Sequence, residues 1–467
     1  MRYERTLKNI EEYDYLDIPV SEGFQLIDAD GNEAFLARGD SCFRLTIHRF
    51  PTREETQHPE RCNANGDYFD PEKKELAFRV TSSLGPSTSD HVEFKIAAVE
   101  TEEFDHTTPA YHQLIVKNTH DYWLTDTFAH NALIAMNVDG KFAEGIRVDV
   151  DGVRYHLYFT KERHFFESTG PVTTDTFLTV ARTVMICFGL LVGKIDMNEA
   201  MVFQYTDDTF HSTERFAYLN NLPRDYASDV VYIEADTRSY FRDDKKHEAI
   251  KDEVHPISLE SFSRLCTMAL NDNDLFRAIH LILEANTASM EARGILYTAI
   301  LETLSRIIIG GEDLKQASPL PEALGNEMIA KMHAIARGYF GEEYELDGPG
   351  KLIRNKIEGL NDASSTGALI LPFVKMKIPI SGKDKKIIRY RNDYLHGRTP
   401  VADAELMVML QDHLRITYKL GFYIYALLLK YIGHEGKIHN LVVDRARDHG
   451  KVQREDPFLD IGKRIEF

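Results

Sequence analysis

Cysteine is scarce in this chain of 467 residues, and positive charge is outweighed by negative charge. The four cysteines lie far apart without a C-x-x-C pair, so their spacing predicts neither a disulfide framework nor a zinc site, and simple burial is their expected role; they are Cys42, Cys62, Cys187 and Cys266. The 55 Lys and Arg residues are opposed by 74 Asp and Glu residues, giving a net charge of −19. This balance argues against a globally basic nucleic-acid coat protein but is compatible with a local basic patch.

Long apolar runs are also rare. The longest, residues 177–193, is close to the minimum length for a membrane span and contains Arg182, so we interpret it as a buried helix. The first residues are charged rather than apolar, which disfavours a secretion signal and makes the cytoplasm, without a membrane partner, the expected location. Hydrophobic residues make up 43% of the chain, enough for two or three packed domains.

The first third of the chain has the pattern of β-strands. Apolar residues alternate along residues 43–47 and 92–96, and Asp-Gly pairs separate such segments. The clearest pair is Asp151-Gly152 between residues 147–150 and 153–159. Since both positions of a type I′ turn need positive φ, Asp-Gly predicts a hairpin there. We therefore predict a β-rich N-terminal domain over residues 1–235.

The period becomes helical after a charged stretch that we interpret as a linker, residues 236–257. Leu296, Ile300 and Leu304 recur at helical spacing, and Glu302 and Arg306 are placed for an i,i+4 pair. A second stripe extends from Leu406 to Tyr431, with Thr417 as its one clearly polar interruption. The predicted fold class is thus α+β and multidomain, with an all-α helical domain over residues 258–467.

Motifs for nucleotides and metals are weak. Residues 189–195 resemble a phosphate loop that is one residue short and ends in Ile where the metal-binding hydroxyl belongs. The segment from Asp28 to Gly31 is too short for a calcium loop and predicts a turn. His106, His112 and His120 lack metal-ligand spacing, so we expect surface or hydrogen-bonded histidines there. No metal and no cofactor is predicted.

One basic segment stands out against the acidic background. Residues 375–398 contain eight Lys and Arg and two Asp, a local net charge of +6. Such a segment suits a polyanion, although a solvated face balanced by acidic neighbours explains the charge equally well. The residues that we predict to bind the backbone of such a polyanion are Lys383, Lys385, Lys386, Arg389 and Arg398.

The end of this segment carries residues suited to acid–base chemistry. Arg391 offers a fork of donors that fits a phosphate, and His396 can act as a general base near neutral pH. Residues five apart lie about 140° apart around a helix, so the pair requires a helix end, which Gly397 and Pro400 favour. A helix-capping histidine beside a surface arginine is the simpler alternative.

The string Arg391-Asn392-x-x-x-His396 resembles the R-x(4–6)-H motif of HEPN ribonucleases. Residues 275–280 and 292–304 resemble the early helices of such domains, and a long amphipathic helix follows the motif, as in that family. A β-rich N-terminal half joined to a C-terminal HEPN domain is similar to ApeA-like abortive-infection proteins of bacteria.

The resemblance implies a HEPN helical bundle with metal-independent endoribonuclease activity, acting in anti-phage defence in the bacterial cytoplasm. It implies Arg391 and His396 as the catalytic pair, with Asn392 orienting it, and a homodimer through the HEPN domain. RNA is the implied substrate, with transfer RNA as the class that several such families cleave, and the N-terminal domain would sense a phage-derived trigger. The alternative is a HEPN-like module that binds RNA, a nucleotide or a protein without catalysis.

Overall fold

The computed structural model describes residues 24–38, 43–47, 64–69, 76–87, 92–101, 104–138, 141–160, 163–197, 199–208, 215–219, 226–228, 230–233, 250, 253–316, 320–346, 348–361, 365–395, 406–442 and 458–461. The chain divides into two compact units: unit 1 comprises residues 1–228 and 256–271, and unit 2 comprises residues 229–255 and 272–467. Most of the described strands lie in unit 1 and most of the described helices in unit 2, which confirms the α+β class. Most of the predicted linker, residues 236–257, lies outside the described residues.

Helix α5 (Leu259–Asn271) belongs to unit 1, although its helical pattern led us to assign it to the C-terminal domain. Its contacts explain the difference. The ring of Phe262 packs edge-on against Phe128 at 5.2 Å between centroids, and the Ser263 hydroxyl accepts a hydrogen bond from the Asp149 N–H at 2.9 Å. The helix therefore packs on the β-rich part of the chain, and the division into units does not follow the predicted boundary.

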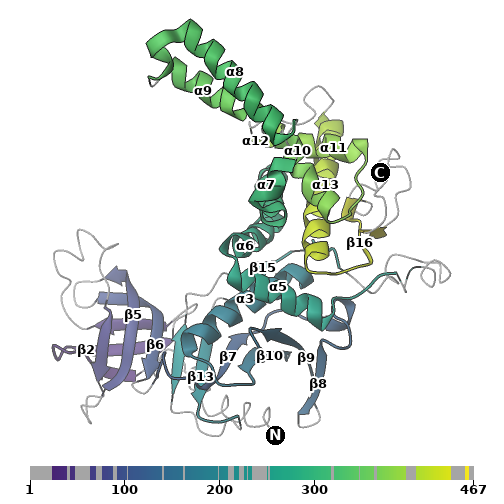
Figure 1. Ribbon diagram of the computed structural model, residues 1–467. Coiled ribbons are helices and arrows are strands. Elements are labelled where there is room, and N and C mark those ends of the chain that lie inside the picture. The colour runs from purple at the N-terminus through teal and green to yellow at the C-terminus, as the bar shows by residue number, and fades with distance from the viewer. Residues whose placement is uncertain are drawn as a thin grey trace. The chain divides into compact units, whose positions relative to one another are not determined.

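Unit 1 begins with a closed antiparallel ring of strands: β1 (Phe24–Ile27), β2 (Glu33–Arg38), β3 (Phe43–Ile47), β4 (Gly66–Phe69), β5 (Leu76–Ser87) and β6 (Val92–Thr101). Their order is β3-β2-β1-β4-β5-β6, and β6 also pairs with β3, so the ring has no free edge among these strands (Figure 1). Alternate side chains such as Leu36, Leu45 and Phe94 fill its core. The two strands predicted from alternation at residues 43–47 and 92–96 are confirmed.

The same sheet continues from β6 through β14 (Phe216–Leu219), β13 (Ala200–Tyr205), β7 (Tyr111–Lys117), β11 (Arg163–Ser168), β10 (Val153–Phe159), β9 (Lys141–Val150) and β8 (Leu133–Val138). The predicted hairpin between β9 and β10 is confirmed, because Val150 pairs with Val153 and the two turn residues, Asp151 and Gly152, both have positive φ. The predicted turn at Asp28 also forms, with its carboxylate accepting from the N–H of Asp30 and of Asn32.

Helix α3 (Thr174–Val192) is the longest apolar segment, and it lies buried in unit 1 as predicted. By length and composition alone it could cross a membrane, but most of its side chains are covered by protein. Phe177 stacks with His112 of β7, and Phe188 stacks with Phe159 of β10, so aromatic rings join the helix to the sheet. Cys187 on α3 is buried, as is Cys266 on α5, whereas Cys42 and Cys62 lie outside the described residues.

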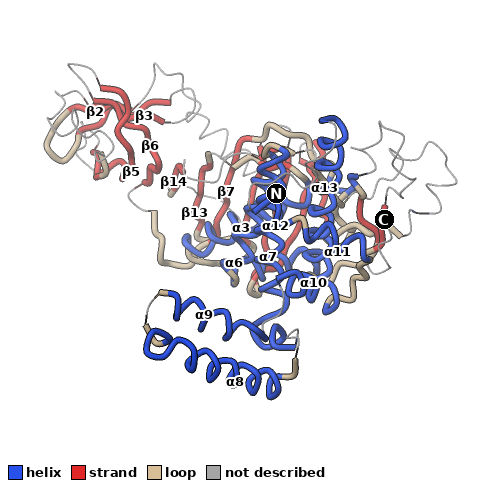
Figure 2. Tube along the Cα trace, turned by 90° about the horizontal axis from the view of Figure 1, so that it is seen from above, coloured by secondary structure: helices blue, strands red, loops and turns tan. Residues whose placement is uncertain are grey.

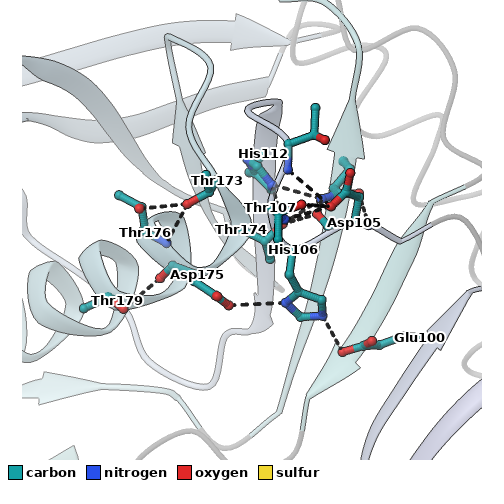
Figure 3. A network of polar contacts seen from close by, with 12 residues as sticks. Glu100, Asp105, His106, Thr107, His112, Thr173, Thr174, Asp175, Thr176 and Thr179 are labelled. Carbon is teal, nitrogen blue, oxygen red and sulfur yellow. Dashed lines mark hydrogen bonds and ion pairs between the residues drawn. The ribbon is translucent and has the colours of Figure 1, made fainter.

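Polar contacts fix the beginning of α3 (Figure 3). The Thr174 hydroxyl donates to the Asp105 carbonyl at 2.9 Å, so its oxygen accepts from Nε2–H of the buried His112 at 2.9 Å. His106 lies between two carboxylates, with Nε2 3.0 Å from Glu100 and Nδ1 3.3 Å from Asp175. These two histidines are hydrogen-bonded, as expected from their sequence context.

Unit 2 is built from helices: α6 (Asn273–Thr287), α7 (Met290–Gln316), α8 (Glu322–Phe340), α9 (Pro349–Glu358), α10 (Ser365–Lys375), α11 (Gly382–Arg389), α12 (Arg391–Leu395) and α13 (Leu406–Tyr431). The predicted helix over Leu406–Tyr431 is confirmed with the same bounds. Helix α7 packs against α6, α10, α12 and α13. Two short strands, β16 (Lys437–His439) and β17 (Phe458–Asp460), pair near the C-terminus.

Helices α8 and α9 form a hairpin that extends from the other helices of unit 2 (Figures 1 and 2). Two short 3-10 turns, η5 (Gly341–Tyr344) and η6 (Gly359–Asn361), adjoin the helices of the hairpin. Tyr344 is fully buried and forms a small core with Ala336 and Ile357. The hairpin thus has packing of its own.

Candidate functional site

The basic segment forms helix α11, which has one charged face and one buried face. Lys383, Lys386 and Arg389 recur every three residues and are exposed, whereas Asp384 and Ile388 are fully buried. Lys385 is half-buried, and its N–H donates to the Ser381 carbonyl at 3.1 Å. The exposed face therefore carries a row of three cations.

Asp384 has a structural role, and its buried carboxylate does not neutralise the three exposed cations. Its carboxylate accepts from the Ser381 N–H, while the Ser381 hydroxyl accepts from the Asp384 N–H at 3.3 Å, which is a reciprocal N-terminal cap. The other carboxylate oxygen accepts from the Tyr423 hydroxyl of α13 at 2.8 Å. The one acidic side chain of α11 is thus bound inside the unit, where it fixes α11 on α13.

Arg391 begins helix α12 and is held by a carboxylate of α7. Its Nε and Nη2 both contact one oxygen of Glu302, and the two side chains are 18% and 38% exposed. This contact replaces the i,i+4 pair expected within α7, because Arg306 instead bonds Asp274 of α6, with 2.9 Å between nitrogen and oxygen. The carboxylate restrains the guanidinium in a half-buried position.

Tyr394 fixes the other end of α12. Its ring lies directly on Gly294 of α7, where a Cβ atom would collide with it, and its hydroxyl is 3.2 Å from the hydroxyl of Thr417 on α13. His413 packs against the ring at 5.2 Å between centroids. Burial raises the pKa of Tyr394 and lowers the pKa of His413, so both are neutral at pH 7. Helix α12 is therefore anchored on both α7 and α13.

The predicted site residues have different outcomes. Arg391 lies in the α12 anchor, and the exposed cations lie on α11, the helix that directly precedes α12. Asn392 is in α12, and its side chain lies outside what the structure describes. His396 and Arg398 fall in residues 396–405, which are also outside the described residues.

Sequence reasoning missed the contact of Glu302 with Arg391 and the anchoring role of Tyr394. Glu302 is far from Arg391 in the sequence, so only the fold shows their contact. Tyr394 had an indirect signal, because Thr417 interrupts the apolar stripe of α13 and Thr417 is its hydroxyl partner. No signal in the sequence singled out Gly294 as the residue beneath that ring.

Among the described residues, no group of three or more His, Cys, Asp or Glu side chains is placed to hold a metal ion. Comparison with known proteins found no family model, no curated protein and no solved structure that matches this chain. The contacts around α11 and α12 are therefore the observations from which a function can be argued.

Proposed function

We propose that the chain is a metal-independent endoribonuclease of the HEPN type, with Arg391 and His396 as its catalytic pair. The observation that carries the proposal is the restraint of Arg391 by Glu302 beside a helix with three exposed cations. A half-buried guanidinium fixed by a carboxylate is preorganised for binding a phosphate. The R-x4-H string of the sequence supplies the partner base.

The chemistry requires only side chains and the substrate itself. His396 accepts the proton of a ribose 2′-OH, and the oxygen attacks the adjacent phosphorus while the bond to the 5′-oxygen breaks. The leaving 5′-oxygen takes a proton from solvent water, to which His396 returns the proton that it accepted, so the products are a 2′,3′-cyclic phosphate and a 5′-OH end. Arg391 stabilises the negative charge that builds on the phosphate oxygens, and Asn392 orients the pair. DNA lacks the 2′-OH and is not cleaved.

The exposed cations of α11 bind the RNA backbone in this proposal. Lys383, Lys386 and Arg389 are solvent-accessible, and Asp384 is occupied by its own partners inside the unit, so the charge of the row is not cancelled by that carboxylate. Lys385 and Arg398 extend the same basic segment in the sequence. Contacts of this kind are electrostatic and weaken with salt.

The setting of the activity follows from the family resemblance. The HEPN domain acts as a homodimer in the bacterial cytoplasm, transfer RNA is the substrate, and the β-rich unit senses a phage-derived trigger. The role of the whole protein is abortive infection, in which the nuclease stops growth of an infected cell.

Cleavage of bulk transfer RNA by the purified full chain in EDTA tests the proposal. Wild-type protein is expected to produce 2′,3′-cyclic phosphate ends, and His396→Ala is expected to produce none. The matched control is His280→Ala, which removes a half-buried histidine on α6 of the same unit and should cut like wild type. The purified protein cuts nothing if it needs a trigger that the assay lacks. In that case toxicity on expression is the readout, and toxicity that is abolished by His396→Ala but not by His280→Ala supports the nuclease.

The outcome that contradicts the proposal is RNA binding without cleavage or toxicity, unchanged in His396→Ala. That result would favour the non-catalytic HEPN-like binding module. The same conclusion would follow if wild type showed neither toxicity nor cyclic phosphate and replacing the α11 cations abolished RNA binding.

A further inference from the structure

The α8–α9 hairpin concentrates exposed apolar side chains. In the part of the chain that the structure describes, eleven large hydrophobic residues are exposed, and eight of them lie between residues 322 and 361. They are Leu324, Met332, Ile335, Tyr339, Phe340, Leu346, Leu352 and Leu360. Such a concentration marks an interaction surface, because single exposed hydrophobics are normally scattered.

Helix α8 carries two neighbouring apolar faces. One face packs inside the hairpin and includes Ile329 and Ala336. The other, which we call the α8 stripe, consists of Leu324, Met328, Met332, Ile335 and Tyr339. At 100° per residue these five positions fall within an arc of about 80°, so they form one continuous face. Tyr339 is 86% exposed, Ile335 56% and Leu324 51%, and Met328 is half-buried.

The charge of the hairpin limits the classes of molecule that can bind it. Residues 322–361 contain five Lys and Arg and seven Asp and Glu, a net charge of −2, which suits neither RNA nor an anionic membrane surface. The charges next to the stripe, Glu327 and Lys331, neutralise each other at 2.6 Å between nitrogen and oxygen. A protein surface that is apolar and nearly uncharged at its contact fits this face.

Four of the five residues of the α8 stripe are spaced symmetrically about one centre, and the fifth, Met332, has Lys331 at its symmetric position. Leu324 and Tyr339 lie equally far from the midpoint between residues 331 and 332, as do Met328 and Ile335. Two copies of α8 related by a two-fold axis at that midpoint would lie antiparallel, with Leu324 opposite Tyr339 and Met328 opposite Ile335. An isologous interface requires this kind of self-complementary surface.

We propose that the α8 stripe binds the same stripe of a second copy of this chain, as an antiparallel helix pair. The neutral Glu327–Lys331 flank removes the like-charge repulsion that two copies of one surface would otherwise have. The proposal concerns the hairpin alone, adds a contact to the homodimer that the proposed function includes, and stands whether or not the chain is a nuclease. A stable interface uses about 20–30 residues on each side, so one helix pair gives a weak, concentration-dependent dimer.

Sedimentation velocity of the full chain over a range of concentrations tests the contact. Wild-type protein is expected to associate as its concentration rises, and Ile335→Asp is expected to raise the dissociation constant about tenfold or more, because it places a charge within the apolar stripe, opposite Met328 of the second copy. Ala330→Asp is the matched control: it adds the same charge to an exposed position on the opposite face of α8 and should associate like wild type. Association that is equal in Ile335→Asp and wild type overturns the proposal.

Crosslinking tests the orientation independently of folding effects. A mixture of Leu324→Cys and Tyr339→Cys proteins is expected to form a disulfide-linked dimer between the two variants, above the background of wild-type protein. Leu324→Cys alone should not crosslink to itself, because the two copies of residue 324 would be about 22 Å apart, well beyond the Cα separation of a disulfide. Self-crosslinking of Leu324→Cys, or no crosslink in the mixture, contradicts the antiparallel pair.

Discussion

The contact between Glu302 and Arg391 is expected to couple the two residues energetically, and a double-mutant cycle can measure it. The variants are Glu302→Gln, Arg391→Gln and the double variant. Exposed ion pairs contribute about 0–1 kcal/mol, and breaking a buried pair costs about 3–5 kcal/mol. With side chains 18% and 38% exposed, this pair lies between those limits, so we expect a coupling of about 1–2 kcal/mol.

Urea unfolding followed by circular dichroism at the helix band is a suitable assay, because most described helices belong to unit 2. The exposed pair Asp274–Arg306 is the matched control. It also joins α7 to a neighbouring helix, but its side chains are 55% and 65% exposed, so its coupling should stay below about 0.5 kcal/mol. Equal couplings for the two pairs would refute the argument that burial strengthens the contact at Glu302.

The variant Glu302→Gln also distinguishes an effect on stability from an effect on catalysis. If Glu302 positions the guanidinium for a phosphate, Glu302→Gln is expected to lower the cleavage rate about tenfold at saturating RNA while its apparent affinity for RNA changes little, since about 1.4 kcal/mol corresponds to tenfold. Asp274→Asn should cleave like wild type. A cleavage rate for Glu302→Gln equal to that of wild type would show that the carboxylate serves only to attach α12.

Two further predictions use other parts of the chain. Burial lowers the pKa of His112 to about 4 from the ordinary 6.5, so the unfolded chain binds this proton more readily, and the contribution of His112 to stability, present above pH 6.5, falls by about 2 kcal/mol by pH 5. Burial also lowers the pKa of His164 and of His434 to about 4, so His112→Gln should reduce the pH dependence of urea unfolding without removing it, and an unchanged slope would contradict the argument. Replacing the exposed cations of α11 by Ala, in the variant Lys383→Ala/Lys386→Ala/Arg389→Ala, should reduce the slope of log affinity against log salt by about 2 for single-stranded RNA. The matched variant Lys331→Ala/Lys351→Ala/Lys356→Ala on the hairpin should leave the slope unchanged.

Local rules predicted much of this fold. The hairpin turn at Asp151-Gly152 follows from the two positive φ angles that only such a pair accepts readily, and both angles are present. The helix Leu406–Tyr431 follows from a 3.6-residue apolar period that Thr417 alone clearly interrupts. In both cases the determining interactions lie within a few residues of one another, so the sequence contains the whole argument.

The arrangement of the candidate site depends on distant residues and could be predicted only in part. The basic row of α11 was visible as composition, because it is a single helix face. The partners of Arg391 and Tyr394 were not visible, since Glu302 and Gly294 lie on α7, about a hundred residues earlier in the chain. A carboxylate on a helix has several possible partners within one turn and many more in space, and the packing of α12 selects among them.

Helix α8 shows the same limit for apolar stripes. The stripes of α13 and α8 both have helical spacing, and periodicity alone indicates a helix with an apolar face in each case. In α13 that face is buried, with Leu420, Ile424 and Leu427 fully covered, whereas the α8 stripe is exposed. What distinguishes them is the number of elements that a fold can place around each helix. The described elements that pack most closely on α8 are α9 and two short turns, and its second face stays exposed, which is why we propose a second copy of the chain as its partner.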